Sequence, residues 1–182
     1  MVRHEASGVT LVELLIALLM LSILMGMGAG SFRPLLQKIR LQSQAEDVLA
    51  GLFLARSEAI KRGVRVTACV SSDGAHCLTR GDWDQGWLIF EDLDANALRA
   101  ESEALIQVHA AMPSTIKANG NSPVARYVSY APTGRSVYVS GAFQAGTITL
   151  CSASVQTAPA WSLVVNAVGK PRLEKSALTA CP

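Results

Sequence analysis

Four cysteines give the sequence its clearest covalent chemistry. They are Cys69, Cys77, Cys151 and Cys181, an even number in a chain of 182 residues. An even count indicates disulfides formed in an oxidising compartment. Of the three possible pairings we favour Cys69–Cys77 and Cys151–Cys181, the second of which would stabilise the fold by about 3–4 kcal/mol. Zinc is the rival, but the cysteines lack the close spacing of structural zinc sites, so we expect no metal.

A short basic segment near the C-terminus could bind anions. Lys170, Arg172 and Lys175 follow Gly169 closely. Cations on a glycine-marked turn can contact the phosphates of a nucleic acid without reading its bases. The alternative is a solvated hairpin tip whose charges serve solubility. Residues 73–103 hold eight acidic and two basic side chains, whereas residues 104–182 hold one acidic and six basic ones, so the C-terminal half supplies the basic face.

An acidic segment imitates a calcium-binding loop. Asp92, Asp94 and Asn96 alternate, and Glu103 stands at the twelfth position. The sixth position is Ala97, where such loops need glycine for a sharp turn. We therefore expect a solvated acidic loop.

No residues are spaced as a catalytic site requires. His4, His76 and His109 have no nucleophile arrangement around them, and no glycine-rich phosphate loop is present. Trp83 and Trp87 are expected to pack in the core. The sequence predicts a protein that is not an enzyme and holds no cofactor.

One carboxylate, Glu13, lies inside an apolar run from Val9 to Gly30. As a helix this run would span roughly 33 Å, about the thickness of the hydrocarbon core of a bilayer. It predicts a transmembrane helix over residues 9–30. The carboxylate then needs a cationic partner, or else it reaches the membrane interface. A secretory signal peptide is disfavoured because the run is too long and no small-x-small cleavage site follows it.

The residues around Glu13 carry a resemblance to a known family. Gly8-Val9-Thr10-Leu11-Val12-Glu13 resembles the class III leader of type IV pilins and pseudopilins, although Val9 stands where the family usually has Phe. In that family a prepilin peptidase cuts after the glycine and methylates the new amine. The glutamate then pairs with the amine of a neighbouring subunit. The resemblance implies a leader over residues 1–8, processing between Gly8 and Val9, and assembly through Glu13.

The helical pattern continues beyond Pro34, and we expect an amphipathic helix over residues 31–62. Gly63 ends this helix. Gly26, Gly28 and Gly30 favour a kink before it. The apolar positions expected to pack on a domain are Leu35, Leu36, Ile39, Ala45, Val48, Leu49, Leu52, Phe53, Ala59 and Ile60.

After Gly63 the apolar period changes to two, which is typical of strands. The expected strands are 64–70, 86–91, 105–110, 126–130, 136–140, 147–150 and 162–168. The predicted architecture is α+β, with a long N-terminal helix packed on an antiparallel β-rich head, residues 63–182, built from two small sheets.

Segments 55–62, 83–92 and 130–135 resemble motifs of the GspH/FimT family of minor pilins and pseudopilins. Residues 168–175 resemble the Gly-Arg-x-Arg motif of FimT-type minor pilins that bind DNA, with Lys170 in place of the first arginine. The family resemblance implies a pilin-like fold and a structural role in a filament.

Two kinds of filament subunit share this leader and fold. A type IV pilus minor pilin is favoured by the predicted disulfides and the basic turn, and a type II secretion pseudopilin of GspH type is the alternative. The implied partners are other pilins or pseudopilins, the prepilin peptidase, an inner-membrane assembly platform and, through phosphate contacts, double-stranded DNA. The implied location is the inner membrane with the head in the periplasm, and then the filament.

Overall fold

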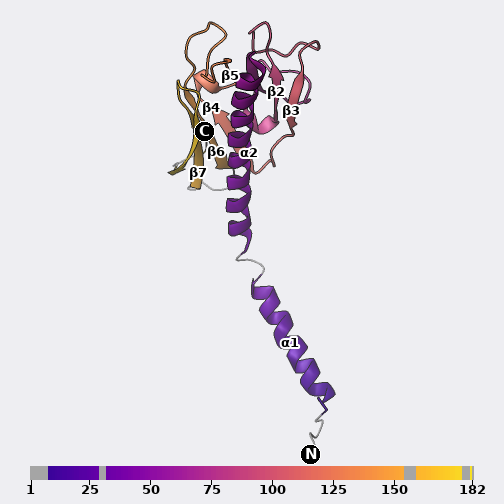
Figure 1. Cartoon of the computed structure of the whole chain (residues 1–182). Coiled ribbons are helices and arrows are strands. Elements are labelled where there is room, and N and C mark those ends of the chain that lie inside the picture. Colours follow the sequence, from indigo (N-terminus) through magenta and orange to yellow (C-terminus); the bar gives the residue numbers. More distant parts are fainter. Residues whose placement is uncertain (1–7, 29–31, 154–158, 178–180, 182) are drawn as a thin grey trace, which may run out of the picture. The chain divides into compact units, whose positions relative to one another are not determined.

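The computed structural model describes residues 8–28, 32–153, 159–177 and 181 (Figure 1). The chain divides into two compact units, residues 1–38 and 39–182. The first contains helix α1 (Leu11–Gly28), an apolar helix with Glu13 in its first turn. Residues 1–7 of the predicted leader and Gly30 of the predicted kink lie outside the described residues. Within those residues, no helix combines the length and the apolar character that crossing a membrane requires.

Helix α2 (Phe32–Arg62) belongs to the second unit from Ile39 onward and buries one stripe of side chains in the core of that unit. The stripe consists of Leu41, Ala45, Val48, Leu52, Ala55 and Ala59. Successive members are three or four residues apart, so they share one face of the helix. The helix ends at Arg62, and Gly63 follows with a φ of 68° and donates its N–H to Ala59 O at 3.1 Å. This is the glycine-type end that the sequence predicts.

The predicted stripe was too wide. Leu35, Leu36, Ile39, Phe53 and Ile60 are exposed. Phe53 and Ile60 each follow a buried position by one residue, and one residue turns an α-helix by about 100°. Their side chains therefore point away from the buried face.

The first sheet, sheet A, has four strands in the order β3-β2-β1-β5, and each neighbouring pair is antiparallel. Its strands are β1 (Val66–Val70), β2 (Trp87–Glu91), β3 (Leu105–His109) and β5 (Tyr127–Tyr130). The second sheet, sheet B, has the order β4-β6-β7-β8 and is also antiparallel. Its strands are β4 (Ile116–Gly120), β6 (Gly146–Ser152), β7 (Pro159–Val165) and β8 (Pro171–Ala177). Short 3-10 helices cover Trp83–Gln85 and Ser122–Val124.

One apolar core joins α2 to both sheets (Figure 1). The closest approach is at Gly51 of α2, where an added Cβ would lie 2.1 Å from Cη2 of Trp87. Trp87 therefore lies directly against the helix backbone. Trp83 is also fully buried, and its indole N–H donates to Val124 O at 2.9 Å. Both tryptophans are core residues, as predicted.

The structure confirms the α+β architecture with two antiparallel sheets and corrects several strands. Strands β4 and β8 were not predicted. The expected strand 136–140 forms only isolated bridges, because the chain turns back at Gly141, whose φ is 82°. The expected strand 162–168 ends at Val165, because a turn follows in which Gly169 donates its N–H to Asn166 O at 2.8 Å.

Gly51→Ala should destabilise the protein by about 1–3 kcal/mol, because the new methyl group overlaps the Trp87 ring and overpacks the core. Thermal unfolding of the detergent-solubilised chain, followed by circular dichroism, measures the change. Ser57→Ala, on the exposed face of the same helix, is the matched control and should change the stability by less than about 0.5 kcal/mol. Equal stabilities of Gly51→Ala and wild type would contradict the close contact.

Candidate functional site

The N-terminal junction leads directly into α1. Gly8 and Val9 are exposed, and Thr10 precedes the helix. The hydroxyl of Thr10 accepts the Glu13 N–H at 3.3 Å, and Thr10 O accepts the Leu14 N–H at 3.2 Å. Thr10 is therefore the N-cap, and Glu13 is in the first turn, where a carboxylate is favourable to the helix dipole. A cut after Gly8 would leave this cap intact.

The predicted basic residues divide between a turn and two faces of a strand. Lys170 lies in the turn after β7, where its N–H donates to Asn166 Oδ1 at 3.0 Å. Arg172 and Lys175 lie on β8 and are three residues apart, so they point to opposite faces. Lys175 Nζ lies 5.5 Å from the ring centroid of Trp161, which packs on the core. The three cations thus do not share one face, which corrects the expected cluster.

Arg172 is partly neutralised. Its Nε lies 2.8 Å from Glu174 Oε1, on the same exposed face of β8. An exposed pair of this kind contributes little to stability, but it lowers the positive charge that an anion meets. Lys170 has no such pair among the described residues. The positive charge of Lys170 is therefore not offset by a neighbouring carboxylate, unlike that of Arg172.

A basic residue that sequence reasoning did not assign to this site lies beside the turn. Gly134 and Arg135 belong to a second glycine turn, and a Cβ on Gly169 would lie 2.1 Å from Gly134 O. Arg135 is exposed. The sequence motif containing Gly134 and Arg135 was visible, but nothing in the sequence indicated that the two turns touch.

All four cysteines form disulfides, with the two pairings that the sequence favoured. Cys69, in β1, bonds to Cys77, and Cys151, in β6, bonds to Cys181 near the C-terminus. A disulfide sulfur is not a thiolate ligand, so these residues cannot hold zinc in this state.

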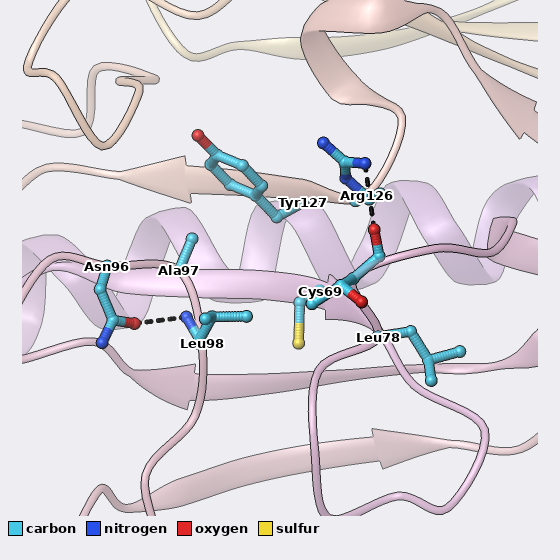
Figure 2. Close-up of a pocket in the computed structure, with 8 residues that line it drawn as sticks. Cys69, Leu78, Asn96, Ala97, Leu98, Arg126 and Tyr127 are labelled. Carbon is cyan, nitrogen blue, oxygen red and sulfur yellow. Dashed lines mark hydrogen bonds between the residues drawn. The ribbon is translucent and has the colours of Figure 1, made fainter.

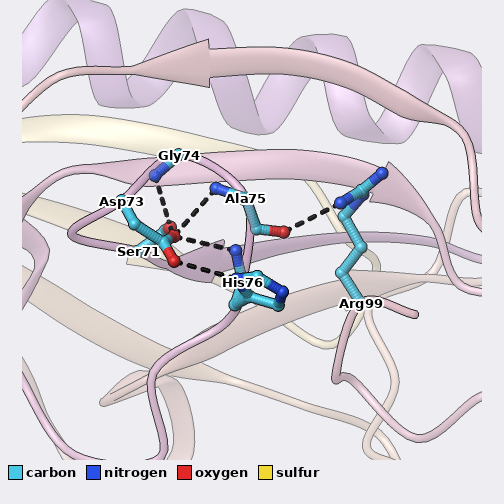
Figure 3. Close-up of polar contacts among 6 residues, drawn as sticks. All are labelled: Ser71, Asp73, Gly74, Ala75, His76 and Arg99. Atoms are coloured by element: carbon cyan, nitrogen blue, oxygen red, sulfur yellow. Dashed lines mark hydrogen bonds and ion pairs between the residues drawn. The ribbon is translucent and has the colours of Figure 1, made fainter. Parts of the chain in front are cut away.

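The loop closed by Cys69 and Cys77 is organised by one aspartate (Figure 3). Asp73 Oδ1 accepts the N–H groups of Ala75 at 2.8 Å and His76 at 2.9 Å, and the Ser71 hydroxyl at 3.1 Å. The His76 ring nitrogen Nδ1 lies 2.9 Å from Asp73 Oδ2. These hydrogen bonds favour the charged carboxylate, and the backbone N–H of His76 is the largest cause that holds the pKa of Asp73 well below its usual range.

Most residues of the acidic loop are exposed, as the sequence predicts, but two of its carboxylates are buried. Asp92 and Glu103 are almost fully buried and Asp94 is exposed. Asp92 Oδ2 accepts the hydroxyl of Thr67 at 2.6 Å and the N–H of Ala97 at 3.2 Å. Burial raises the pKa of Asp92, and these hydrogen bonds oppose that rise.

Glu103 closes the other end of the loop. Its two carboxylate oxygens accept the N–H groups of Leu93 at 2.8 Å and Ala100 at 2.9 Å. Oxygens of Asp92, Asp94 and Glu103 lie within 4.8 Å of one another. The buried carboxylates therefore accept hydrogen bonds from backbone N–H groups of the loop.

A cavity of about 340 Å³ lies between these two loops and β5 (Figure 2). Its apolar lining includes Leu78, Leu98 and Tyr127. Arg126 stands at its rim and donates from Nη1 to Thr79 O at 3.0 Å. Within residues 32–153, neither this lining nor His76 and His109 place a base next to a nucleophile. His109 instead stacks on Trp87, with ring centroids 4.4 Å apart.

Comparison with known families decides what kind of protein this is. The sequence model of a family described as Type II transport protein GspH matches residues 44–169, more than half of the chain. The chain belongs to this family. A second model, the prokaryotic N-terminal methylation motif, matches residues 3–29. The GspH family member described here is therefore a pilin or pseudopilin subunit, a structural component of a type IV pilus or a type II secretion system.

The solved structure of a minor pilin supports the pilin-like fold. The type IV minor pilin FimU of Pseudomonas aeruginosa strain PAO1 is 23% identical with a TM-score of 0.57, over 80% of this chain and 98% of that one. The minor pseudopilin EpsH from the type 2 secretion system of Vibrio cholerae is 10% identical with a TM-score of 0.49, over 76% of this chain and 97% of that one. No curated protein matches the chain significantly.

The depressed pKa of Asp73 makes a test of its loop possible. A group whose pKa is lowered in the folded state loses its contribution only when the pH falls through that lowered value. The amide protons of Ala75 and His76 should therefore keep their chemical shifts and exchange protection from pH 5 down to pH 3, measured by NMR. Asp73→Ala should remove this protection at every pH. A titration midpoint near pH 4 in the wild type would contradict the assignment.

Proposed function

We propose that this GspH family member is a minor pilin of a type IV pilus. It is anchored in the inner membrane by residues 9–30 with its head in the periplasm, is cut and methylated between Gly8 and Val9, and then enters the filament. The match of residues 3–29 to the N-terminal methylation motif supports the processing and the membrane anchoring, and the two disulfides and the basic turn at residues 169–172 favour a pilus over a secretion system. In support, the Gly8–Val9 bond lies directly before the capped start of α1.

Assembly depends on Glu13 and on helix packing. After cleavage, the carboxylate of Glu13 pairs with the Val9 amine of a neighbouring subunit, because a charge in a medium of low dielectric constant needs an opposite charge nearby. On α2, the exposed residues Ile39, Phe53 and Ile60 are separated by multiples of seven and share one face. That face supplies apolar contacts to neighbouring helices. The prepilin peptidase and the assembly platform are the partners in these steps.

The alternative is a pseudopilin of GspH type in a type II secretion system, which the description of the matching family favours. The two assignments differ in the final location of the protein. A minor pilin is recovered with pili sheared from the cell surface. A pseudopilin stays in the cell envelope, and its deletion stops protein export.

Gly8→Leu should block processing, because a large side chain stands at the cleaved bond. When the chain is produced together with a prepilin peptidase, mass spectrometry should find wild-type protein that begins at N-methylated Val9 and a variant that keeps its leader. Ser7→Ala is the matched control and should be processed. Glu13→Gln should also be processed but should fail to enter filaments. An unprocessed wild-type chain would contradict the proposal.

A second function, DNA binding, is favoured by the position of Lys170 and Arg172, exposed at one end of sheet B. Each can contact a phosphate, and neither needs to read the base sequence. Lys175 contributes little, because it lies on the other face of β8 against Trp161. Binding of this kind is weak and falls steeply with salt concentration.

Glu174→Gln should raise the affinity for duplex DNA roughly twofold, because it frees Arg172 from its ion pair and removes a negative charge. Arg172→Ala should lower the affinity and reduce the salt dependence by about one phosphate contact. Fluorescence anisotropy with labelled DNA at two salt concentrations measures both effects, with Lys175→Ala as the control. Unchanged affinities in Glu174→Gln and Arg172→Ala would remove Arg172 from the site.

A further inference from the structure

Two turns that are distant in the sequence form one rigid surface. Gly169 is buried and has a φ of 80°, and a Cβ there would lie 2.1 Å from Gly134 O and 2.9 Å from the Ser136 N atom. The Ser136 hydroxyl also lies 2.8 Å from Asn166 O. The turn 131–135 and the turn 166–169 are therefore in direct backbone contact. Only glycine, with no side chain, permits this approach at residue 169.

The contact brings two exposed cations together. Arg135 directly follows Gly134, and Lys170 directly follows Gly169, so each stands next to the point where the turns meet. Among residues 8–28, 32–153 and 159–177, no carboxylate pairs with Arg135 or Lys170. This distinguishes them from Arg172, which is paired with Glu174.

A third cation fixes the turn that carries Arg135. Arg56, half-buried on α2, donates from Nε to Gly134 O at 2.9 Å. The turn is closed by its own hydrogen bonds, from Gly134 N–H to Ala131 O at 2.8 Å and from Ala131 N–H to Arg135 O at 2.9 Å. The backbone beneath Arg135 is thus held from two sides. A cation on such a fixed backbone loses less conformational freedom on binding than one on a mobile loop.

We propose that Arg135 and Lys170 together form a phosphate-binding site, with Arg56 as the positioning residue beneath it. The inference rests on the proposed DNA-binding function, and it names Arg135 as a contact residue in place of Lys175. The guanidinium group of Arg135 presents a planar fork that binds two phosphate oxygens at once, and Lys170 adds a point charge.

The ligand that fits is the backbone of a nucleic acid. Duplex DNA carries about one negative charge per 1.7 Å of its axis, so two neighbouring cations can be satisfied by neighbouring phosphates. Carboxylates on a protein surface do not repeat at such a regular and close spacing. A carboxylate surface of another subunit is accordingly the weaker match.

The test uses the full chain in an uncharged detergent, titrated with short duplex DNA and, separately, with inorganic tripolyphosphate. Arg135→Ala and Lys170→Ala should each lower the DNA affinity about five- to tenfold and reduce the salt slope by about one contact. Lys175→Ala carries the same change of charge on the other face of β8 and should change the affinity less than about twofold. Arg135→Lys should recover part of the loss, because a cation returns to the same turn. Thermal unfolding of each variant checks that the fold is intact.

The outcomes separate this inference from the function on which it rests. If Lys170→Ala weakens DNA binding but Arg135→Ala does not, the two-turn site is wrong and DNA binding stands. If the wild type binds tripolyphosphate but no DNA, and both variants lose tripolyphosphate binding, the phosphate site is supported and the DNA-binding function is contradicted. If neither ligand binds, or if Lys175→Ala has the largest effect, the inference is overturned.

Discussion

The head depends on the close approach of one helix to two sheets. The buried stripe of α2 is made mostly of small and medium side chains, and at Gly51 there is no side chain at all. Trp87 fills the space that this leaves, and strands of both sheets meet the helix in a single core. Because packed interiors tolerate neither voids nor overlap, the spacing between helix and sheets is set by these few side chains. The turns and loops that carry the charged residues take their positions from that frame.

The features that sequence reasoning predicted correctly are those that local patterns encode. They include the glycine that ends α2, both favoured disulfide pairings and all four strands of sheet A. Strands β4 and β8 escaped prediction because they form the two edges of sheet B. An edge strand is commonly protected from aggregation by charged side chains, and Lys117, Arg172, Glu174 and Lys175 leave few apolar residues in these two strands. The buried face of α2 was predicted too wide because the helix also carries exposed apolar residues. Apolar residues on a helix need not face its own domain.

The candidate site was only partly predictable. A basic turn can be recognised in the sequence. Which other basic side chains lie next to it depends on contacts between distant segments. Lys175 looked equivalent to Arg172 until the alternation of β8 placed the two on opposite faces. Arg135 is distant from Lys170 in the sequence, and only the contact between Gly169 and Gly134 brings their two turns together. The acidic loop shows the same limit, because only the fold reveals that Asp92 and Glu103 are turned inward to bind backbone amides.

The bond between Cys151 and Cys181 has a consequence for proteolysis. It encloses β7 and β8 in one covalent ring that begins in β6 and closes near the C-terminus. A protease that cuts the chain once within this ring leaves two fragments that are still joined, and an edge strand that would otherwise peel away stays tethered to the sheet. Nicked protein would therefore migrate as an intact chain under oxidising conditions and separate only after reduction. In an environment rich in proteases, the ring lets the subunit survive a single cut.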